Sequence, residues 1–190
     1  MAGKKRIGVL ALQGAFAEHQ EVLHRLGCEA TRVRSQGDIR SVDGLIIPGG
    51  ESTTIGRLLV DFNLADTIRQ AAEEGMPVFG TCAGMIVLAK EIIGSEQFRL
   101  GLMDMAVRRN AFGRQVESFE EWLDIKGFER QVKGVFIRAP YVEKVWGGAE
   151  VLAELDGKIV MVRQGKLLAT AFHPELTDDL VIHEYFVRMA

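Results

Sequence analysis

Hydrophobic positions in the first half of the chain alternate between short continuous runs and stretches with helical spacing. The continuous runs, such as residues 6–12 and 44–47, are typical of strands buried on both faces of a parallel sheet. Between them, Val22, Leu23 and Leu26 recur at the spacing of an amphipathic helix. The predicted elements of this half are strands at residues 6–12, 29–34, 44–47 and 77–80 and helices at residues 17–26, 53–63, 64–74 and 82–93. This alternation predicts βαβ units around a parallel sheet.

The second half of the chain consists of short strand-like runs separated by turns that contain glycine. Asp156-Gly157 between two such runs is a strong hairpin signal. Strands are predicted at residues 103–109, 119–126, 132–138, 150–155, 158–164 and 167–172, and a last helix at 178–189. We therefore predict an α/β fold, a flavodoxin-like three-layer sandwich whose mostly parallel central sheet gains antiparallel strands in the C-terminal half.

Composition narrows the class of protein. The 190 residues, 47% of them hydrophobic, suit a single globular domain over residues 1–190. A formal net charge of −3 argues against a nucleic-acid partner, and no apolar stretch approaches the roughly 20 residues of a membrane span. The two cysteines, Cys28 and Cys82, are too few for a disulfide scaffold, so we expect a protein of the reducing cytoplasm.

A cysteine lies in a glycine-flanked turn between a predicted strand and a predicted helix. Gly80-Thr81-Cys82-Ala83-Gly84 has the form of a nucleophile elbow with cysteine in place of serine. The glycines permit a tight turn, and the following helix N-terminus favours the thiolate of Cys82. The backbone N–H of Ala83 is a candidate oxyanion donor. The alternative is that Cys82 only packs in a glycine-rich turn, which we expect of Cys28.

A histidine and a carboxylate follow the strand predicted at residues 167–172. His173 precedes a proline and should be extended, so its side chain points the same way as that of Glu175. This arrangement suits a carboxylate that orients an imidazole serving the thiol of Cys82, although His-Pro-Glu is also a plausible surface turn. No two-histidine metal spacing occurs, so we expect neither a metal site nor a cofactor. The other histidines are predicted to be surface or packing residues on helices: His19, His24 and His183.

A glycine-rich loop follows the strand predicted at residues 44–47. Gly49-Gly50 allows the backbone to approach a ligand closely, so the N–H of Gly50 is a second candidate oxyanion donor. Phosphate binding is the rival interpretation, but no Gly-Lys-Ser/Thr follows, so the loop is not a P-loop. Ser52 or Thr53 can also serve as the N-cap of the next helix.

Three motifs in this order resemble the class I (triad) glutamine amidotransferase family. They are residues 48–53 (PGGEST), 80–84 (GTCAG) and 172–175 (FHPE). Further motifs make the chain similar to the glutaminase subunits of pyridoxal 5′-phosphate synthase within that family. These motifs are residues 12–14 (LQG), 109–115 (RNAFGRQ), 134–140 (GVFIRAP) and 172–177 (FHPELT).

The resemblance implies hydrolysis of L-glutamine to L-glutamate and ammonia. Cys82 would be the nucleophile, His173 the general base and acid, and Glu175 the residue that orients His173. The implied glutamine-binding residues are Gly50, Glu51, Ser52, Arg109, Ile137 and Arg138. An arginine suits the α-carboxylate of a free amino acid, although both arginines could instead form ordinary surface ion pairs.

The resemblance also implies a protein partner. Members of this group act with a (β/α)₈-barrel synthase in a large hetero-oligomer, and Gln13 is a candidate for that interface. Three alternatives remain open at this point. They are the glutaminase subunit of another triad amidotransferase, of the histidine or para-aminobenzoate type; a cysteine hydrolase acting on another amide; and a non-catalytic regulatory module of the same fold.

Overall fold

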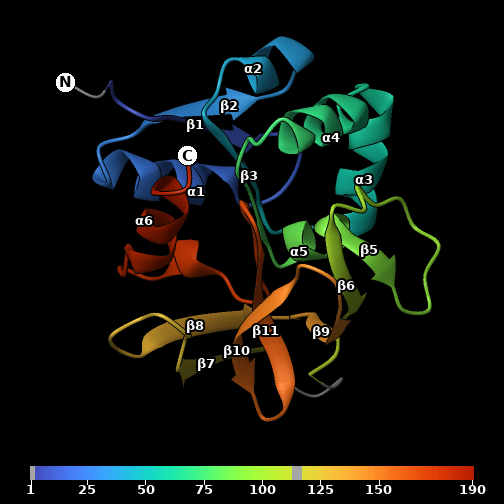
Figure 1. The fold of residues 1–190 in the computed structure, drawn as a ribbon, viewed down its shortest axis with the longest axis vertical. Helices are drawn as coiled ribbons and strands as arrows, with labels where there is room; N and C mark the ends of the chain where they lie inside the picture. The colour runs from blue at the N-terminus through green and yellow to red at the C-terminus, as the bar shows by residue number, and fades with distance from the viewer. Residues whose placement is uncertain (1–2, 113–116) are drawn as a thin grey trace.

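The chain folds into a large curled sheet flanked by helices, seen in a computed structural model that describes residues 3–112 and 117–190 (Figure 1). The strands are β1 (Arg6–Leu10), β2 (Glu29–Val33), β3 (Gly44–Ile47), β4 (Val78–Thr81), β5 (Ala89–Ile92), β6 (Met103–Arg108), β7 (Ser118–Leu123), β8 (Val132–Ile137), β9 (Tyr141–Val145), β10 (Glu150–Leu155), β11 (Lys158–Gln164) and β12 (Leu167–Thr170). The helices are α1 (Phe16–Arg25), α2 (Gln36–Arg40), α3 (Ser52–Asp61), α4 (Ala65–Glu73), α5 (Ala83–Leu88) and α6 (Val181–Val187), with a 3₁₀ turn, η1, at Pro174–Leu176.

Five neighbouring strands form the parallel part of the sheet, in the order β2-β1-β3-β4-β12. This is the strand order of flavodoxin-like folds. Beyond β12, antiparallel pairing adds β11, β10 and β9, and β6 and β5 extend that edge. Helices α1 and α6 cover one side of the parallel strands, and α3, α4 and α5 lie on the other (Figure 1). The predicted fold class is therefore confirmed.

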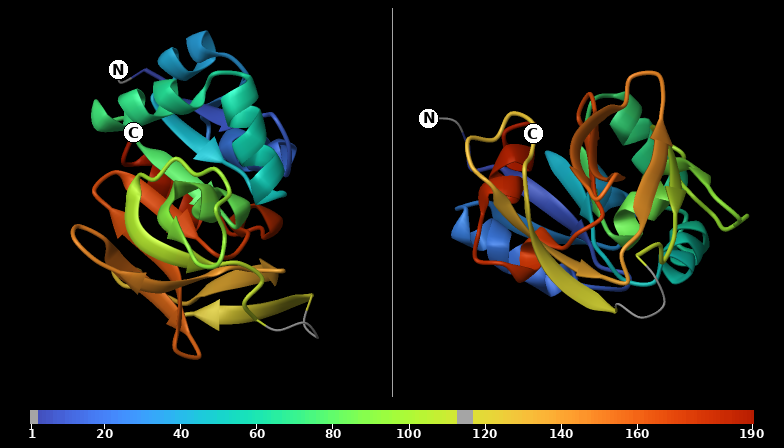
Figure 2. Two further views of the ribbon diagram at one scale, coloured as in Figure 1. Left: turned by 90° about the vertical axis from the view of Figure 1, so that its right-hand side faces the viewer. Right: turned by 90° about the horizontal axis from the view of Figure 1, so that it is seen from below.

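The β7–β8 pair forms a separate two-stranded sheet within the described part of the chain. The left view of Figure 2 shows this pair below the parallel strands, and β8 contacts the η1 turn. The contact is direct, because the backbone N–H of His173 donates to the carbonyl of Val135 in β8 at 2.8 Å. The β7–β8 pair thus contacts and supports the segment that follows β12.

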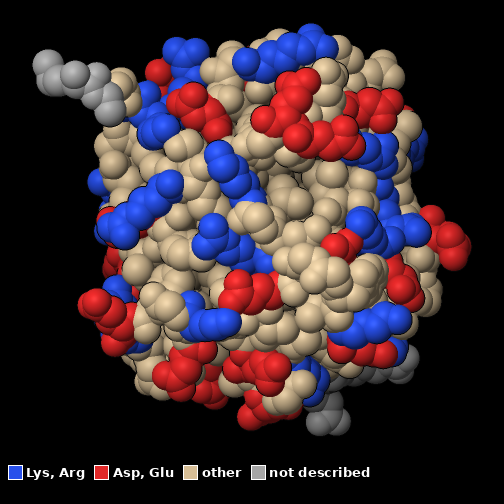
Figure 3. All heavy atoms as spheres, viewed as in Figure 1, with Lys and Arg blue, Asp and Glu red and all other residues tan. Residues whose placement is uncertain are grey.

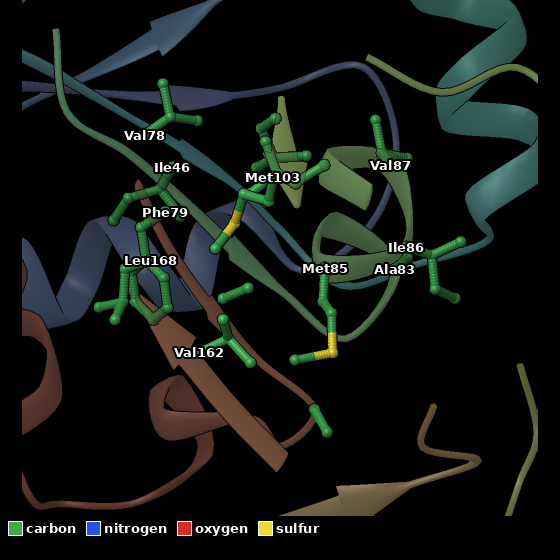
Figure 4. Packing of buried hydrophobic residues seen from close by; sticks show 14 of the residues in the cluster. Ile46, Val78, Phe79, Ala83, Met85, Ile86, Val87, Met103, Val162 and Leu168 are labelled. Atoms are coloured by element: carbon green, nitrogen blue, oxygen red, sulfur yellow. The ribbon is translucent and has the colours of Figure 1, made fainter. Parts of the chain in front are cut away.

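The core lies between the parallel strands and the helices. Every residue of β3 and β4 is buried, as expected of strands covered on both faces. Figure 4 shows Ile46, Phe79 and Leu168 from three adjacent strands packed together. The ends of β3, β4 and β12 are therefore held by a close-packed interior.

Several predicted elements were wrong or missing. The helix expected at residues 82–93 ends at Leu88, and the chain continues as β5, which pairs in parallel with β6. A short apolar run does not by itself distinguish a helix from a buried strand, and pairing with β6 decides it here. The helix expected at residues 178–189 spans only Val181–Val187, and α2 and β9 were not predicted.

The surface carries both signs of charge. Figure 3 shows basic and acidic side chains interspersed over the displayed face rather than gathered into a field of one sign. Of the helices that the structure describes, none is long and apolar enough to span a bilayer.

Candidate active site

The loops that follow β1, β3, β4 and β12 meet at the carboxyl end of the parallel strands. They enclose a cavity of about 440 Å³. Ligands of open α/β sheets bind at this edge, near the point where the strand order reverses, which here lies between β1 and β3. The predicted site residues that line the cavity are Gly50, Glu51, Ser52, Cys82, Ala83, Arg109, Ile137, Arg138 and His173.

Cys82 occupies a strained turn between β4 and α5. Its backbone has φ 51° and ψ −103°, a region that non-glycine residues seldom adopt. The turn is possible because α5 packs directly on β3: a methyl group added at Gly84 would overlap the carbonyl oxygen of Ile47. The Cys82 sulfur lies 3.8 Å from the carbonyl oxygen of Ile137, on the opposite wall of the cavity. The elbow geometry expected from the sequence is therefore present.

His173 and Glu175 form a buried pair beside this cysteine. Nδ1 of His173 lies 2.6 Å from Oε1 of Glu175, and the two residues are 8% and 6% exposed. His173 has φ −104° and ψ 88°, which is outside the helical region but is not the regular extended conformation that was expected. Glu175 lies in the η1 turn, so the pair arises from a turn and not from a continuous strand. The His173 ring packs on Gly49, where an added methyl group would lie 2.5 Å from Cε1.

The charge balance around His173 favours its imidazolium form. Burial acts to lower the pKa of His173, but hydrogen bonding and charge interaction with Cys82 and Glu175 outweigh burial and raise that pKa well above its usual value. A protonated His173 beside Cys82 is the arrangement that stabilises a thiolate. The ring is then poised to give a proton to a departing amine.

The glycine loop is fixed by two side chains. Glu51 is the N-cap of α3: its carboxylate accepts from the backbone N–H groups of Thr53 and Thr54 at 3.2 and 2.7 Å. Burial works against that charge, but the Thr53 and Thr54 bonds prevail and lower the pKa of Glu51 to about 2. The N-cap is thus Glu51, where Ser52 or Thr53 was expected. Gln13 lies behind the loop and accepts from the Glu51 N–H at 2.8 Å.

The opposite wall carries the two predicted arginines. Arg109 donates to Oε1 of Gln97 at 2.6 Å, and the amide nitrogen of Gln97 donates to Ser52 at 3.0 Å. Arg138 has φ 43° and pairs with Glu117 at 3.3 Å, which is the surface pairing considered as the alternative. Residues 113–115 of the 109–115 motif lie outside the described residues. Gln97 was missed, because its loop carries no sequence signal of chemistry.

Of the three histidines expected to be surface or packing residues on helices, two are packing residues behind the site and the third lies on the surface. His19 and His183 are completely buried and hydrogen-bonded to one another at 2.8 Å, whereas His24 is exposed. His19 also lies 3.6 Å from Oε2 of Glu175. Helical spacing could have indicated that His19 is buried, because it shares a helix face with the buried Val22 and Leu23.

Comparison with known proteins places the chain in a family. The model of the SNO glutamine amidotransferase family matches residues 9–190. The pyridoxal 5′-phosphate synthase subunit PdxT of Moorella thermoacetica is 60% identical over 185 residues, covering 97% of this chain and 98% of that protein. The PdxT subunit of Thermus thermophilus is 56% identical over 186 residues, covering 97% of each chain.

Solved structures agree. A crystal structure described as a glutamine amidotransferase has a TM-score of 0.93 and 55% identity, covering 96% of this chain and 97% of that one. PurLQS from Thermotoga maritima has a TM-score of 0.65 at 20% identity, covering 98% and 96% of the two chains, which shows a shared fold only. The resemblance drawn from the sequence motifs is confirmed: the chain belongs to the SNO glutamine amidotransferase family.

Proposed function

We propose that this chain hydrolyses L-glutamine to L-glutamate and ammonia, as the glutaminase subunit of a pyridoxal 5′-phosphate synthase. The observation that carries the proposal is the position of Cys82 beside the buried His173–Glu175 pair, on the wall of a cavity of about 440 Å³. Relatives named as subunits of that synthase, 54–60% identical to this chain, support the choice of reaction. Residues 1–190 act as one glutaminase domain in the cytoplasm.

Each step of the proposed mechanism uses a residue that lines the cavity. The Cys82 thiolate attacks the side-chain carbonyl carbon of glutamine, and the N–H groups of Gly50 and Ala83 stabilise the oxyanion. His173 gives its proton to the leaving nitrogen, so that ammonia departs and a glutamyl thioester remains. His173 then takes a proton from water, whose hydroxide attacks the thioester and releases glutamate and the thiolate. No metal or cofactor enters these steps.

The remaining cavity residues recognise the substrate. Arg109 and Arg138 line the same cavity as the glycine loop, and a guanidinium suits the α-carboxylate of glutamine; Arg138 would exchange its surface partner Glu117 for that carboxylate. Gly50, Ser52 and Ile137 shape the rest of the cavity, while Glu51 contributes mainly by capping α3 and holding the loop.

The ammonia produced has its use on another chain. We take that partner to be a (β/α)₈-barrel synthase subunit, assembled with many copies of this chain in a large hetero-oligomer. Gln13 contacts the glycine loop through the Glu51 N–H, so docking at Gln13 would act directly on the loop that carries the Gly50 oxyanion donor. The partner that co-purifies with the chain separates this proposal from a histidine-type or para-aminobenzoate-type amidotransferase.

The test is glutamate and ammonia release, measured with and without the synthase subunit. We expect release with the partner present, and its abolition by Cys82→Ala. Arg109→Gln should raise KM for glutamine about tenfold or more with a smaller effect on kcat, because it removes a charge-assisted contact to bound substrate. Arg108→Gln is the matched control, because Arg108 pairs with Glu143 on the surface. Undiminished release by Cys82→Ala would overturn the proposal.

A further inference from the structure

A fully buried polar cluster lies behind the carboxylate of Glu175. It joins His19 of α1, His183 of α6 and Thr81 of β4, each of them 0% exposed. Nδ1 of His19 lies 2.8 Å from Nε2 of His183, and Nε2 of His19 lies 3.2 Å from Oγ1 of Thr81. The mechanism described above uses none of these three side chains. Burial of three polar side chains costs free energy unless each is hydrogen-bonded, so the cluster calls for a physical explanation.

The cluster ends at two atoms that lack hydrogen-bond partners. Among the residues that the structure describes, Oε2 of Glu175 and Nδ1 of His183 are the buried side-chain atoms in this state. The other oxygen of Glu175 is occupied by His173. Oε2 lies 3.6 Å from Nε2 of His19, just beyond hydrogen-bond length. A shift of a few tenths of an ångström would therefore satisfy the carboxylate.

The arrangement selects one tautomer of each ring. A carboxylate oxygen only accepts hydrogen bonds, so Nε2 of His19 must carry the proton that faces Glu175. Nδ1 of a neutral His19 then accepts, and Nε2 of His183 donates to it. This leaves Nδ1 of His183 as a bare acceptor. The opposite assignment would bury an unpaired N–H at His183 and turn a lone pair of His19 toward the carboxylate, and both are costly.

We propose that His19 is a positioning residue for glutamine hydrolysis, which holds the Glu175 carboxylate by donating its Nε2–H toward Oε2. The inference rests on the proposed function. The terminal torsion of a glutamate side chain is broad, so one bond to His173 leaves the carboxylate plane free to turn. A second donor fixes that plane and thereby the orientation of the His173 ring. His183 holds the His19 ring by donating to its Nδ1, and Oγ1 of Thr81 accepts a share of the same Nε2–H that faces Glu175.

The electrostatic environment keeps this donor neutral. Burial, and then the proximity of His183 and His173, lower the pKa of His19 well below its usual value. A neutral His19 donates a hydrogen bond to Glu175 but does not neutralise the charge of the carboxylate. The negative charge of the carboxylate therefore remains available to the imidazolium of His173.

The first test needs no substitution. In the intact protein, ¹⁵N chemical shifts of the imidazole nitrogens identify which nitrogen carries the proton. We expect His19 to be protonated at Nε2 and bare at Nδ1, and His183 to be protonated at Nε2. An Nδ1–H tautomer of His19 would overturn the proposal.

The second test compares two substitutions at one position, assayed with the synthase subunit present. His19→Leu removes the donor, and we expect kcat to fall about tenfold with KM unchanged, as is common when an outer hydrogen-bond partner is lost. His19→Gln can place an amide N–H near the original Nε2, so we expect kcat within about threefold of the parent. His24→Leu, on the exposed face of the same helix, is the control and should match the parent.

A spectroscopic measurement separates failure of this inference from failure of the proposed function. The downfield Nδ1–H proton resonance of His173 reports its bond to Glu175 and needs no glutamine. It should move upfield or broaden in His19→Leu and persist in His19→Gln, even if the parent chain releases no ammonia. A folded His19→Leu with the parental resonance, or equal losses of kcat in both His19 variants, would show that His19 is only structural.

Discussion

Replacing Glu175 with glutamine tests how far the chemistry depends on the charge behind His173. The amide has nearly the shape of the carboxylate, so the buried site keeps its packing while one negative charge is removed. Glutamine can also direct an N–H at Nδ1 of His173, which would force the wrong imidazole tautomer. The substitution therefore weakens both the orientation of the ring and the stability of its protonated form.

The size of the effect follows from the geometry. Two unit charges at the observed 2.6 Å attract by about 6 kcal/mol at an effective dielectric constant of about 20. Burial of both groups opposes part of this attraction. A loss of about 10⁴-fold in kcat corresponds to about 5.5 kcal/mol, and removing the carboxylate charge of a catalytic triad has a cost of that order. We expect Glu175→Gln to lower kcat by about 10³–10⁴-fold.

The assay is glutamate release in the presence of the synthase subunit, across a range of pH. Loss of the carboxylate lowers the pKa of His173, so the alkaline limb of the residual activity should move to lower pH. Glu184→Gln is a suitable control, because Glu184 forms a surface pair with Arg188. A folded Glu175→Gln protein with kcat within about tenfold of the parent would refute the reasoning, because the charge would then contribute under about 1.4 kcal/mol.

Three further outcomes are expected. Burial lowers the pKa of His183 to about 3, so this histidine is neutral in the folded protein and takes up a proton on unfolding at acidic pH. The free energy of unfolding should therefore fall between about pH 7.5 and pH 5.5, by about 1.4 kcal/mol more in the parent than in His183→Leu. Urea denaturation at each pH measures this difference. Gly84→Ala should destabilise the fold by about 2 kcal/mol or more, because its methyl group meets a backbone carbonyl of β3, whereas Gly37→Ala on the surface helix α2 should be neutral or stabilising in thermal melts. A glutamine-like electrophile should label Cys82, which lines the cavity, and leave Cys28, which does not, unmodified in peptide mass spectra; equal labelling of both would argue against a distinct nucleophile.

Local motifs explain why so much of the site was predictable. The elbow needs only a strand, two small residues and a helix start in succession, and all of these are visible around Cys82. His173 and Glu175 are two residues apart, so the intervening proline and the following turn decide their contact. Features set by neighbouring residues can be inferred from the sequence, because few other segments influence them.

Features set by distant segments were missed, because no local pattern shows which segments meet in the fold. His19 and His183 are 164 positions apart, and nothing near either residue shows that α1 and α6 place them in contact. Gln97 bridges Ser52 and Arg109 from an irregular loop without hydrophobic periodicity. The strand β5 looks helical because its apolar residues continue those of α5, and its identity depends on pairing with β6.

The cavity divides into a rigid side and an adaptable side, and this division predicts which kinetic constant each residue controls. Cys82 and His173 follow strands of the buried core, and their positions depend on close packing that tolerates little change. Arg138 and Asn110 lie on the opposite wall in connecting segments, and both have positive φ, as Cys82 does. These two residues are exposed, whereas Cys82 is buried, so the wall can be reshaped by a docking partner more easily than the nucleophile can. Substitutions on the wall should therefore alter glutamine binding and its dependence on the partner, whereas substitutions on the core side should alter the chemical step.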